Sequence, residues 1–231
     1  MNMGENYMKL FRKRAVIVVL ALLILCGIGA ISVYFQYQHT STKRLTDRYS
    51  GHIEKVHCVT DRDGDGVDDQ SDILAGAWTY LNEKHPKYKS VYYAETGWSN
   101  DEYGVCTDVV ANALLAAGYN LQELVDADIK AHPDDYDIEE PDAMIDFRRV
   151  RNLIVYFRHT AISLTTDTSK ITEWQGGDIV IYKSHIGLVS DRRNKDGVPY
   201  LIHHSGVWQR RYEEDMLASW SEPVGHFRIS Q

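Results

Sequence analysis

The sequence predicts an α+β fold, in which a helix that begins at a cysteine packs on an antiparallel sheet. Helical spacing of apolar residues dominates from about residue 70 to residue 157, and short strand patterns dominate from residue 177 to the end of the chain. Helices followed by strands are typical of α+β domains, whereas α/β domains alternate the two. An apolar segment near the N-terminus predicts one membrane-spanning helix before this domain.

The N-terminal segment has the composition of a membrane anchor. Residues 1–14 carry four basic side chains against one acidic one, and residues 15–35 form a run of 21 without a charge. A run of this length can span a bilayer, and the basic tail favours a cytoplasmic N-terminus. A cleaved signal peptide is the alternative, but its apolar stretch is usually about 7–15 residues long. We therefore expect a single-pass anchor in the cell membrane, a polar linker over residues 36–54 and an extracellular domain over residues 55–231.

Composition limits what this domain can do. Beyond residue 14 the chain has 21 Lys and Arg against 32 Asp and Glu, a net charge of −11. Such a surface repels phosphate backbones, so nucleic-acid binding is not expected. With 44% hydrophobic residues and only 3 cysteines, the chain can bury one sizeable core and is not a disulfide scaffold. Nothing in the sequence indicates an oligomeric state.

The stretch DRDGDGVDDQSD, residues 61–72, has the spacing of a calcium loop, with glycine at its sixth position. The ligand positions are held by Asp61, Asp63, Asp65, the carbonyl of Val67, Asp69 and Asp72. The loop resembles EF-hand and thrombospondin type 3 loops, although Asp72 replaces the usual glutamate and no helix enters it. The shorter side chain predicts weak binding and competition by magnesium. We expect a structural Ca²⁺ ion and no organic cofactor, with a solvated acidic turn as the alternative.

Four helices follow from apolar periodicity and capping signals. The first follows Asp72 and has one apolar face; the second begins at Cys106 and stops at Gly118. The third begins near Leu121, with Asn120 as its cap, and the fourth lies over residues 147–157. The arginines beside the fourth helix, Arg148, Arg149 and Arg151, are expected to pair with nearby acids, with binding of substrate carboxylates as the alternative.

Strands are expected over residues 177–182, 185–191, 199–205 and 226–229, with a further short one at 52–59. The Asp196–Gly197 pair predicts a hairpin that makes the second and third of these strands neighbours. His185 begins one of them and His203 lies on the other, so their two imidazoles are expected to meet.

Cys106 is the candidate nucleophile. A cysteine in the first turn of a helix lies among unpaired amides at the positive end of the helix dipole, and both effects predict a lowered thiol pKa. Amide cleavage also requires an imidazole that can protonate the leaving amine. A disulfide between Cys58 and Cys106 is the alternative, since both residues lie outside the membrane.

The segments GVCTDVV, GGDIVIYKSHIGLVSDRR and YLIHHS resemble a bacterial family called domain of unknown function 1287, which is related to the NlpC-type peptidases of the papain-like superfamily. The resemblance covers roughly residues 55–230. It implies a papain-like fold with Cys106 as nucleophile, His185 as base and acid, and His203 as the residue that orients His185. His204 is adjacent to His203, and strand alternation should point only one of the two inward. In some relatives a tyrosine helps to bind the oxyanion, which makes Tyr92, Tyr93 and Tyr103 candidates here.

The resemblance implies a thiol hydrolase that cleaves an amide bond in peptidoglycan peptides of the cell wall. An amidase, an acyltransferase or a thioesterase would use the same local chemistry. A calcium-stabilised cell-wall binding module that has lost activity is the alternative of a different class.

Overall fold

The computed structural model describes residues 3–38 and 40–230, and it divides into two units at residues 39 and 40. The first unit contains helix α1, Met3–Gln38. Its segment Met8–Tyr34 contains an 18-residue window with a mean hydropathy of 3.0 and is long and apolar enough to cross a membrane, as the sequence predicted. Residues 1–2 of the predicted basic tail lie outside the described residues.

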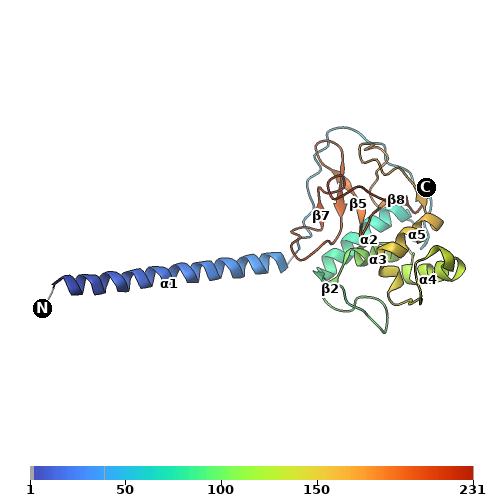
Figure 1. Cartoon of the computed structure of the whole chain (residues 1–231). Coiled ribbons are helices and arrows are strands. Elements are labelled where there is room, and N and C mark those ends of the chain that lie inside the picture. Colours follow the sequence, from blue (N-terminus) through green and yellow to red (C-terminus); the bar gives the residue numbers. More distant parts are fainter. Residues whose placement is uncertain (1–2, 39, 231) are drawn as a thin grey trace. The chain divides into compact units, whose positions relative to one another are not determined.

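In the second unit, Thr40–Gln231, the α-helices precede the strands of the main sheet (Figure 1). Its helices are α2 (Asp69–Lys84), α3 (Cys106–Ala116), α4 (Leu121–Ala131) and α5 (Val150–Thr160), with the short 3₁₀ turns η1 (Pro133–Asp135) and η2 (Asp146–Arg148). All four predicted helices are present. The fourth begins at Val150 rather than at residue 147, because η2 occupies the preceding turn.

Six strands form one sheet in which every neighbouring pair is antiparallel. In sheet order they are β3 (Ile162–Ser163), β8 (Gly225–Arg228), β4 (Ile179–Tyr182), β5 (His185–Arg193), β6 (Pro199–Ile202) and β7 (Glu213–Glu214). Two short strands, β1 (Lys87–Tyr88) and β2 (Tyr103–Gly104), pair in parallel outside it. The four strands expected after residue 176 are present, and the fold is α+β as predicted. Residues 52–59 form no strand, contrary to expectation.

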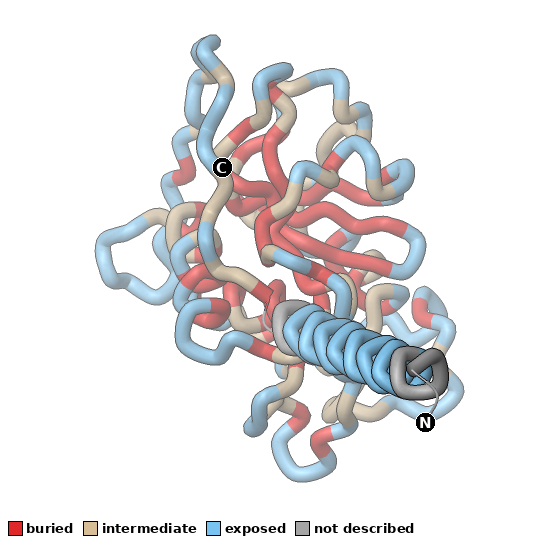
Figure 2. The backbone as a smooth tube through the Cα atoms, turned by 90° about the vertical axis from the view of Figure 1, so that its left-hand side faces the viewer, coloured by how far each residue is buried: buried red, intermediate tan, exposed pale blue. Residues whose placement is uncertain are grey.

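The central strands are buried on both faces (Figure 2). Ile179 and Ile181 of β4 face the core that the helices share, whereas Val180 and Tyr182 face a second apolar cluster built with Trp174. A strand covered on both sides reads as an uninterrupted apolar run, which is why β4 lacks alternation. The sheet therefore gives the ends of β5 and β6 a rigid support.

The predicted linker over residues 36–54 is corrected from Thr40 onward, because that part belongs to the folded unit. Thr40 is buried and donates a hydrogen bond to the carbonyl of Gln209 at 3.1 Å. Arg44 forms ion pairs with Asp191 and Glu213 at the sheet. The polar composition of residues 36–54 suggested a solvated spacer, but Thr40 and Arg44 have hydrogen-bond and ion-pair partners on the domain.

Candidate active site

Cys106 is the first residue of α3, and its local geometry follows from the residues on each side. Asp108 accepts a hydrogen bond from the backbone amide of Val105 at 2.8 Å, which fixes the first turn of the helix. Two residues before Cys106, Gly104 lets the backbone pass close to the Tyr80 hydroxyl, since a Cβ at this position would lie 2.7 Å from that oxygen. The Cys106 thiol is free and only 7% exposed.

The pKa of Cys106 differs from the sequence expectation. Burial raises it to about 11, although the backbone amides of Ile186 and Thr107 act to lower it. The prediction of a lowered pKa was wrong because it counted the helix terminus and not the loss of hydration around the sulfur. In the resting state Cys106 is therefore a neutral thiol.

His185 and His203 meet as predicted. His185 Nε2 lies 2.8 Å from His203 Nδ1, and both side chains are buried. Gly187 makes this contact possible, since a Cβ at that position would come within 3.1 Å of the His203 Cβ and 2.8 Å of Leu201. Burial, and second the neighbouring His203, lower the pKa of His185 to about 3, so its imidazole is neutral at ordinary pH.

Two further residues complete the histidine pair, and the sequence analysis did not identify either. His203 Nε2 lies 3.2 Å from a carboxylate oxygen of Glu214, which stands on the neighbouring strand β7. Trp220 stacks on the ring of His185 at 4.6 Å between centroids and meets His203 edge-on at 5.3 Å. A strand of two residues and a loop tryptophan carry no periodic signal from which these roles could have been inferred.

Cys106 and His185 approach each other where β5 begins. Helix α3 packs against β5, and the sulfur lies against the backbone amide of Ile186, the residue after His185. No hydrogen bond joins the thiol to the His185 ring among the residues that the structure describes. Catalytic contacts are often long in the absence of substrate and tighten when it binds.

His204 is turned to a different environment from His203. It is completely buried, neither ring nitrogen has a hydrogen-bond partner, and it meets Tyr88 and Tyr212 edge-on at 5.1 Å each. Burial is the main cause that lowers its pKa to about 3. Of the two adjacent histidines, His203 is thus the one in contact with His185.

Tyr88 lies near enough to Cys106 for the two groups to interact electrostatically. Burial raises the pKa of Tyr88, and a thiolate at Cys106 would raise it further. The three tyrosines expected for this position have other partners. Tyr92 donates to Asp142, Tyr93 donates to Asp101, and the Tyr103 ring lies under Lys89.

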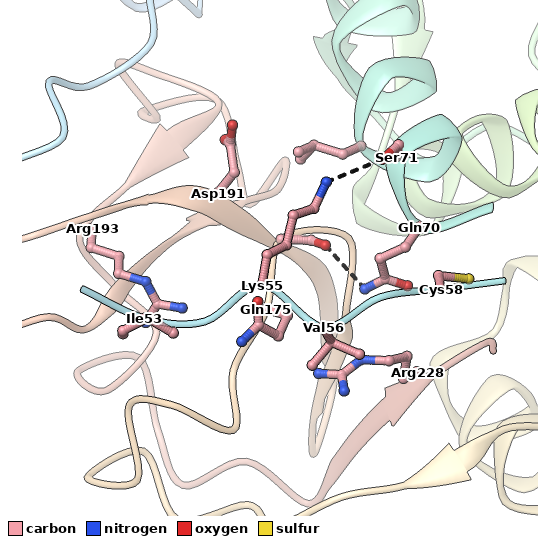
Figure 3. Close-up of a pocket in the computed structure, with 12 residues that line it drawn as sticks. Ile53, Lys55, Val56, Cys58, Gln70, Ser71, Gln175, Asp191, Arg193 and Arg228 are labelled. Atoms are coloured by element: carbon pink, nitrogen blue, oxygen red, sulfur yellow. Dashed lines mark hydrogen bonds between the residues drawn. The ribbon is translucent and has the colours of Figure 1, made fainter. Parts of the chain in front are cut away.

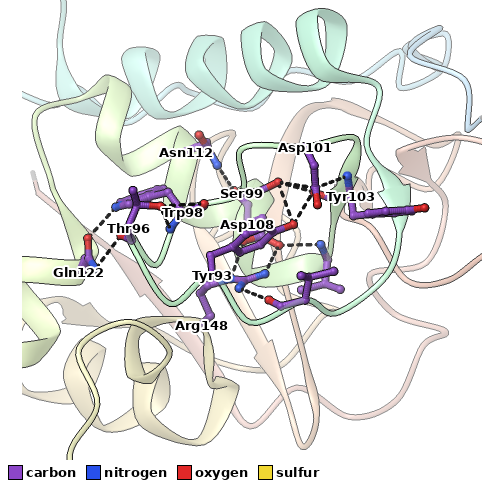
Figure 4. A network of polar contacts seen from close by, with 12 residues as sticks. Tyr93, Thr96, Trp98, Ser99, Asp101, Tyr103, Asp108, Asn112, Gln122 and Arg148 are labelled. Atoms are coloured by element: carbon purple, nitrogen blue, oxygen red, sulfur yellow. Dashed lines mark hydrogen bonds and ion pairs between the residues drawn. The ribbon is translucent and has the colours of Figure 1, made fainter.

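A buried ion pair joins α3 to η2 (Figure 4). Arg148 donates to both carboxylate oxygens of Asp108, at 2.7 and 3.0 Å, and also to the carbonyl of Val91. Arg149 pairs with Asp146 and Arg151 pairs with Asp137. The structural pairing expected for these arginines is confirmed, with one partner on the cysteine helix itself.

The structure brings three of the six predicted calcium ligands together. Asp61, Asp63 and Asp65 bring ligand oxygens within 4.8 Å of one another, and Asp61 accepts backbone hydrogen bonds from residues 64–66. Burial and the charges of neighbouring aspartates raise the pKa of Asp72 to about 6, and its Oδ2 has no partner. Such crowded carboxylates fit a divalent cation at the start of α2.

One predicted ligand, Asp69, is less well suited. Asp69 accepts hydrogen bonds from the Arg62 amide at 2.8 Å and from the Tyr119 hydroxyl at 2.6 Å, so both of its oxygens serve the protein. This corrects its expected role, and its burial within α2 is the physical reason. Val67 is exposed, and its amide donates to Asp65.

Cys58 does not pair with Cys106, since both thiols are free. Its sulfur lies 2.7 Å from the Ser230 hydroxyl. Figure 3 shows Cys58 beside a cavity of about 280 Å³ that Lys55, Gln70 and Arg228 also line. This cavity contains no member of the Cys106, His185 and His203 group, so the two sulfur sites are separate.

Comparisons with known proteins identify relatives without an assigned activity. Residues 77–229 match the family described as "Domain of unknown function (DUF1287)". The chain is 41% identical over 138 residues to the uncharacterized protein YijF of Escherichia coli strain K12, and the match covers 55% of this chain and 64% of that relative. It thus spans less than two thirds of the relative's length. No solved structure matches.

Proposed function

The chain belongs to the DUF1287 family, and we propose that it is an extracytoplasmic cysteine hydrolase that cleaves an amide bond by Cys-His-His catalysis. The observation that carries this proposal is the buried contact of 2.8 Å between His185 and His203, beside a free cysteine that opens a helix. A nucleophile, a base and a residue that orients the base are the parts that such a reaction needs.

The hydrogen bonds fix which nitrogen of His185 can act as the base. A carboxylate only accepts hydrogen bonds, so Glu214 requires a proton on His203 Nε2. His203 Nδ1 then accepts the proton of His185 Nε2, which leaves a lone pair on His185 Nδ1. This is the form of imidazole that can remove a proton from a thiol.

The reaction then proceeds in two stages. His185 takes the thiol proton as the Cys106 sulfur attacks the amide carbonyl, and the amide of Cys106 and the Tyr88 hydroxyl are the proposed donors to the oxyanion. The imidazolium donates this proton to the leaving amine, and an acyl-enzyme remains. Water loses a proton to His185 as it attacks the thioester, and the same proton returns to the sulfur when the acid product leaves.

The substrate and the location follow from the resemblance and from the anchor. The NlpC-type resemblance favours a papain-like arrangement of these elements and peptidoglycan peptides as the substrate. The basic residues at positions 9–14 of α1, which precede its uncharged run, favour a cell-membrane anchor with the domain outside the cell. The loop over residues 61–72 is proposed to bind a structural Ca²⁺ ion.

A second function, a cell-wall binding module without catalysis, is favoured by one observation. Cys106 is 7% exposed and burial raises its pKa to about 11, which is unusual for a reactive cysteine. In this case the histidine pair would be a part of the core.

The test is mass analysis of muropeptides incubated with the full chain, with Cys106→Ala and with His185→Ala. If the protein is a hydrolase, new fragments should form with the unaltered chain and not with Cys106→Ala or His185→Ala. Cys58→Ser is the matched thiol control and should also form them. If no fragments form while the Cys106→Ala protein still sediments with intact peptidoglycan, the binding module replaces the enzyme.

A further inference from the structure

A cluster of two histidines and two aspartates lies at the end of α4, and it shares no residue with the Cys106 site. Asp128 is in the last turn of α4, His132 caps that helix, Asp135 lies in η1 and His159 is near the end of α5. Asp128, His132 and His159 bring one ligand atom each within 4.8 Å of one another. Two separate segments of the chain, residues 128–135 and the end of α5, therefore converge on one point of the surface.

The spacing of these atoms is close to that of a metal centre. His159 Nδ1 lies 2.7 Å from Asp128 Oδ2, and His132 Nε2 lies 3.9 Å from Asp128 Oδ1. Tetrahedral zinc with bonds of about 2.0–2.1 Å separates its ligand atoms by about 3.3 Å. Small side-chain rotations therefore suffice to bring the donors around one ion.

The cluster also contains the second layer of contacts that metal sites use. The Tyr136 hydroxyl donates to Asp128 Oδ2, and His159 Nε2 lies 3.4 Å from Asp135 Oδ2. These contacts hold the ring of His159 and the Asp128 side chain, which is 10% exposed, and they leave Asp128 Oδ1 toward His132. Hydrogen bonds of this kind orient ligands before the ion arrives.

We propose that Asp128, His132 and His159 form a binding site for a zinc-class divalent transition metal, with water as the fourth ligand and Asp135 as the residue that orients His159. Imidazole with carboxylate suits zinc and its neighbours, whereas calcium takes oxygen ligands alone. His132 is 52% exposed, so the ion enters directly from solvent. Bound metal would join the end of α4 to α5.

The test uses the full chain in detergent micelles, freed of metal with a chelator and titrated first with Co²⁺ and then with Zn²⁺. One Co²⁺ should bind with the visible absorption of a tetrahedral nitrogen and oxygen site and without a thiolate charge-transfer band. His132→Gln and His159→Gln should each weaken Zn²⁺ binding at least ~10-fold. His52→Gln, an exposed histidine elsewhere, should leave it unchanged.

Three results would overturn the proposal. These are equal Zn²⁺ affinity in the unaltered chain and in both variants, a thiolate band in the Co²⁺ spectrum, and displacement of the metal by millimolar Ca²⁺. If His159→Gln fails to fold by circular dichroism, His132→Gln decides, because this side chain is 52% exposed. Retained affinity in that folded variant would exclude the site.

Discussion

Glu214 is the residue on which the protonation state of the histidine pair depends. Its carboxylate lies 3.2 Å from His203 Nε2, and only an acceptor at this position directs both ring protons away from His185 Nδ1. A glutamine can donate to the same nitrogen and so permits the opposite arrangement of protons.

We therefore expect Glu214→Gln to lower kcat for muropeptide cleavage by about 10²- to 10⁴-fold, the range that general-base catalysis contributes. KM should change little, because Glu214 is expected to act through His203 and not on the substrate. Steady-state kinetics over a range of pH measures this, with Glu139→Gln, an exposed residue, as the matched control. Unchanged kcat in Glu214→Gln would refute the role.

Buried neutral histidines also make stability depend on pH. His185 and His204 have pKa values lowered to about 3, mainly by burial, whereas an unfolded histidine titrates near 6.5. Below pH 6.5 the unfolded chain binds protons that the folded chain does not, so the free energy of unfolding falls as pH falls toward 3. Each group contributes at most about 1.4 kcal/mol per pH unit.

His204→Phe should reduce this pH dependence, since it removes one of the two groups while keeping an apolar ring beside Tyr88 and Tyr212. Urea unfolding of the full chain at pH 7 and pH 5, followed by near-UV circular dichroism, measures the difference. His52→Gln should retain the full dependence. If the free energy of unfolding falls equally between pH 7 and pH 5 in His204→Phe and in the unaltered chain, His204 is not neutral in the folded protein.

At the scale of elements, α3 carries both the proposed nucleophile and the buried end of an ion pair. Asp108 is 3% exposed and Arg148 is 2% exposed, so the loss of either leaves a buried charge without its partner. The pair fixes α3 against η2 and the segment around Val91.

Arg148→Ala is expected to lower the free energy of unfolding by about 3–5 kcal/mol, as the loss of a buried ion-pair partner does. The matched control is Arg151→Ala, whose exposed pair with Asp137 spans 3.9 Å and should contribute about 0–1 kcal/mol. Chemical denaturation gives both values. Equal effects of the two substitutions would contradict the assigned difference.

The loop over residues 61–72 predicts a response to calcium. Extracellular sites of this type bind with dissociation constants of about 10⁻⁴–10⁻³ M, so about 10 mM Ca²⁺ should stabilise the domain by about 1.4–2.7 kcal/mol. Asp63→Asn should abolish the rise in thermal midpoint, and Glu139→Gln should not. A midpoint that Ca²⁺ leaves unchanged in the unaltered chain would identify the loop as a solvated acidic turn.

For the whole molecule, α1 predicts attachment to a membrane. The full chain should remain in the membrane fraction after washing at alkaline pH, because residues 15–35 form an uncharged, apolar run long enough to span a bilayer. Protease added to intact spheroplasts should digest the domain if it lies outside the cell. Recovery of the chain in the soluble fraction, shortened at its N-terminus, would identify a cleaved signal peptide instead.

The sequence predicted the helices and the central strands because long apolar patterns are local signals. It also predicted the contact of His185 with His203, since the Asp196–Gly197 turn makes their strands neighbours. It did not predict the pKa of Cys106, because the amount of water removed from a side chain depends on the whole packing. Tyr88, Glu214 and the Thr40 segment were missed for a related reason, since each acquires its role through residues distant in the chain.

The register between β5 and β6 decides which imidazole stands next to His185. Leu188 pairs with Ile202, and a bulge lies between Val189 and Arg193. Successive residues of a strand point to opposite faces, so a shift of β6 by one position would present His204 and turn its neighbour away. The number of residues in the connecting hairpin therefore determines which histidine contacts His185. Adding or deleting one residue there would place His204 against His185 instead of His203.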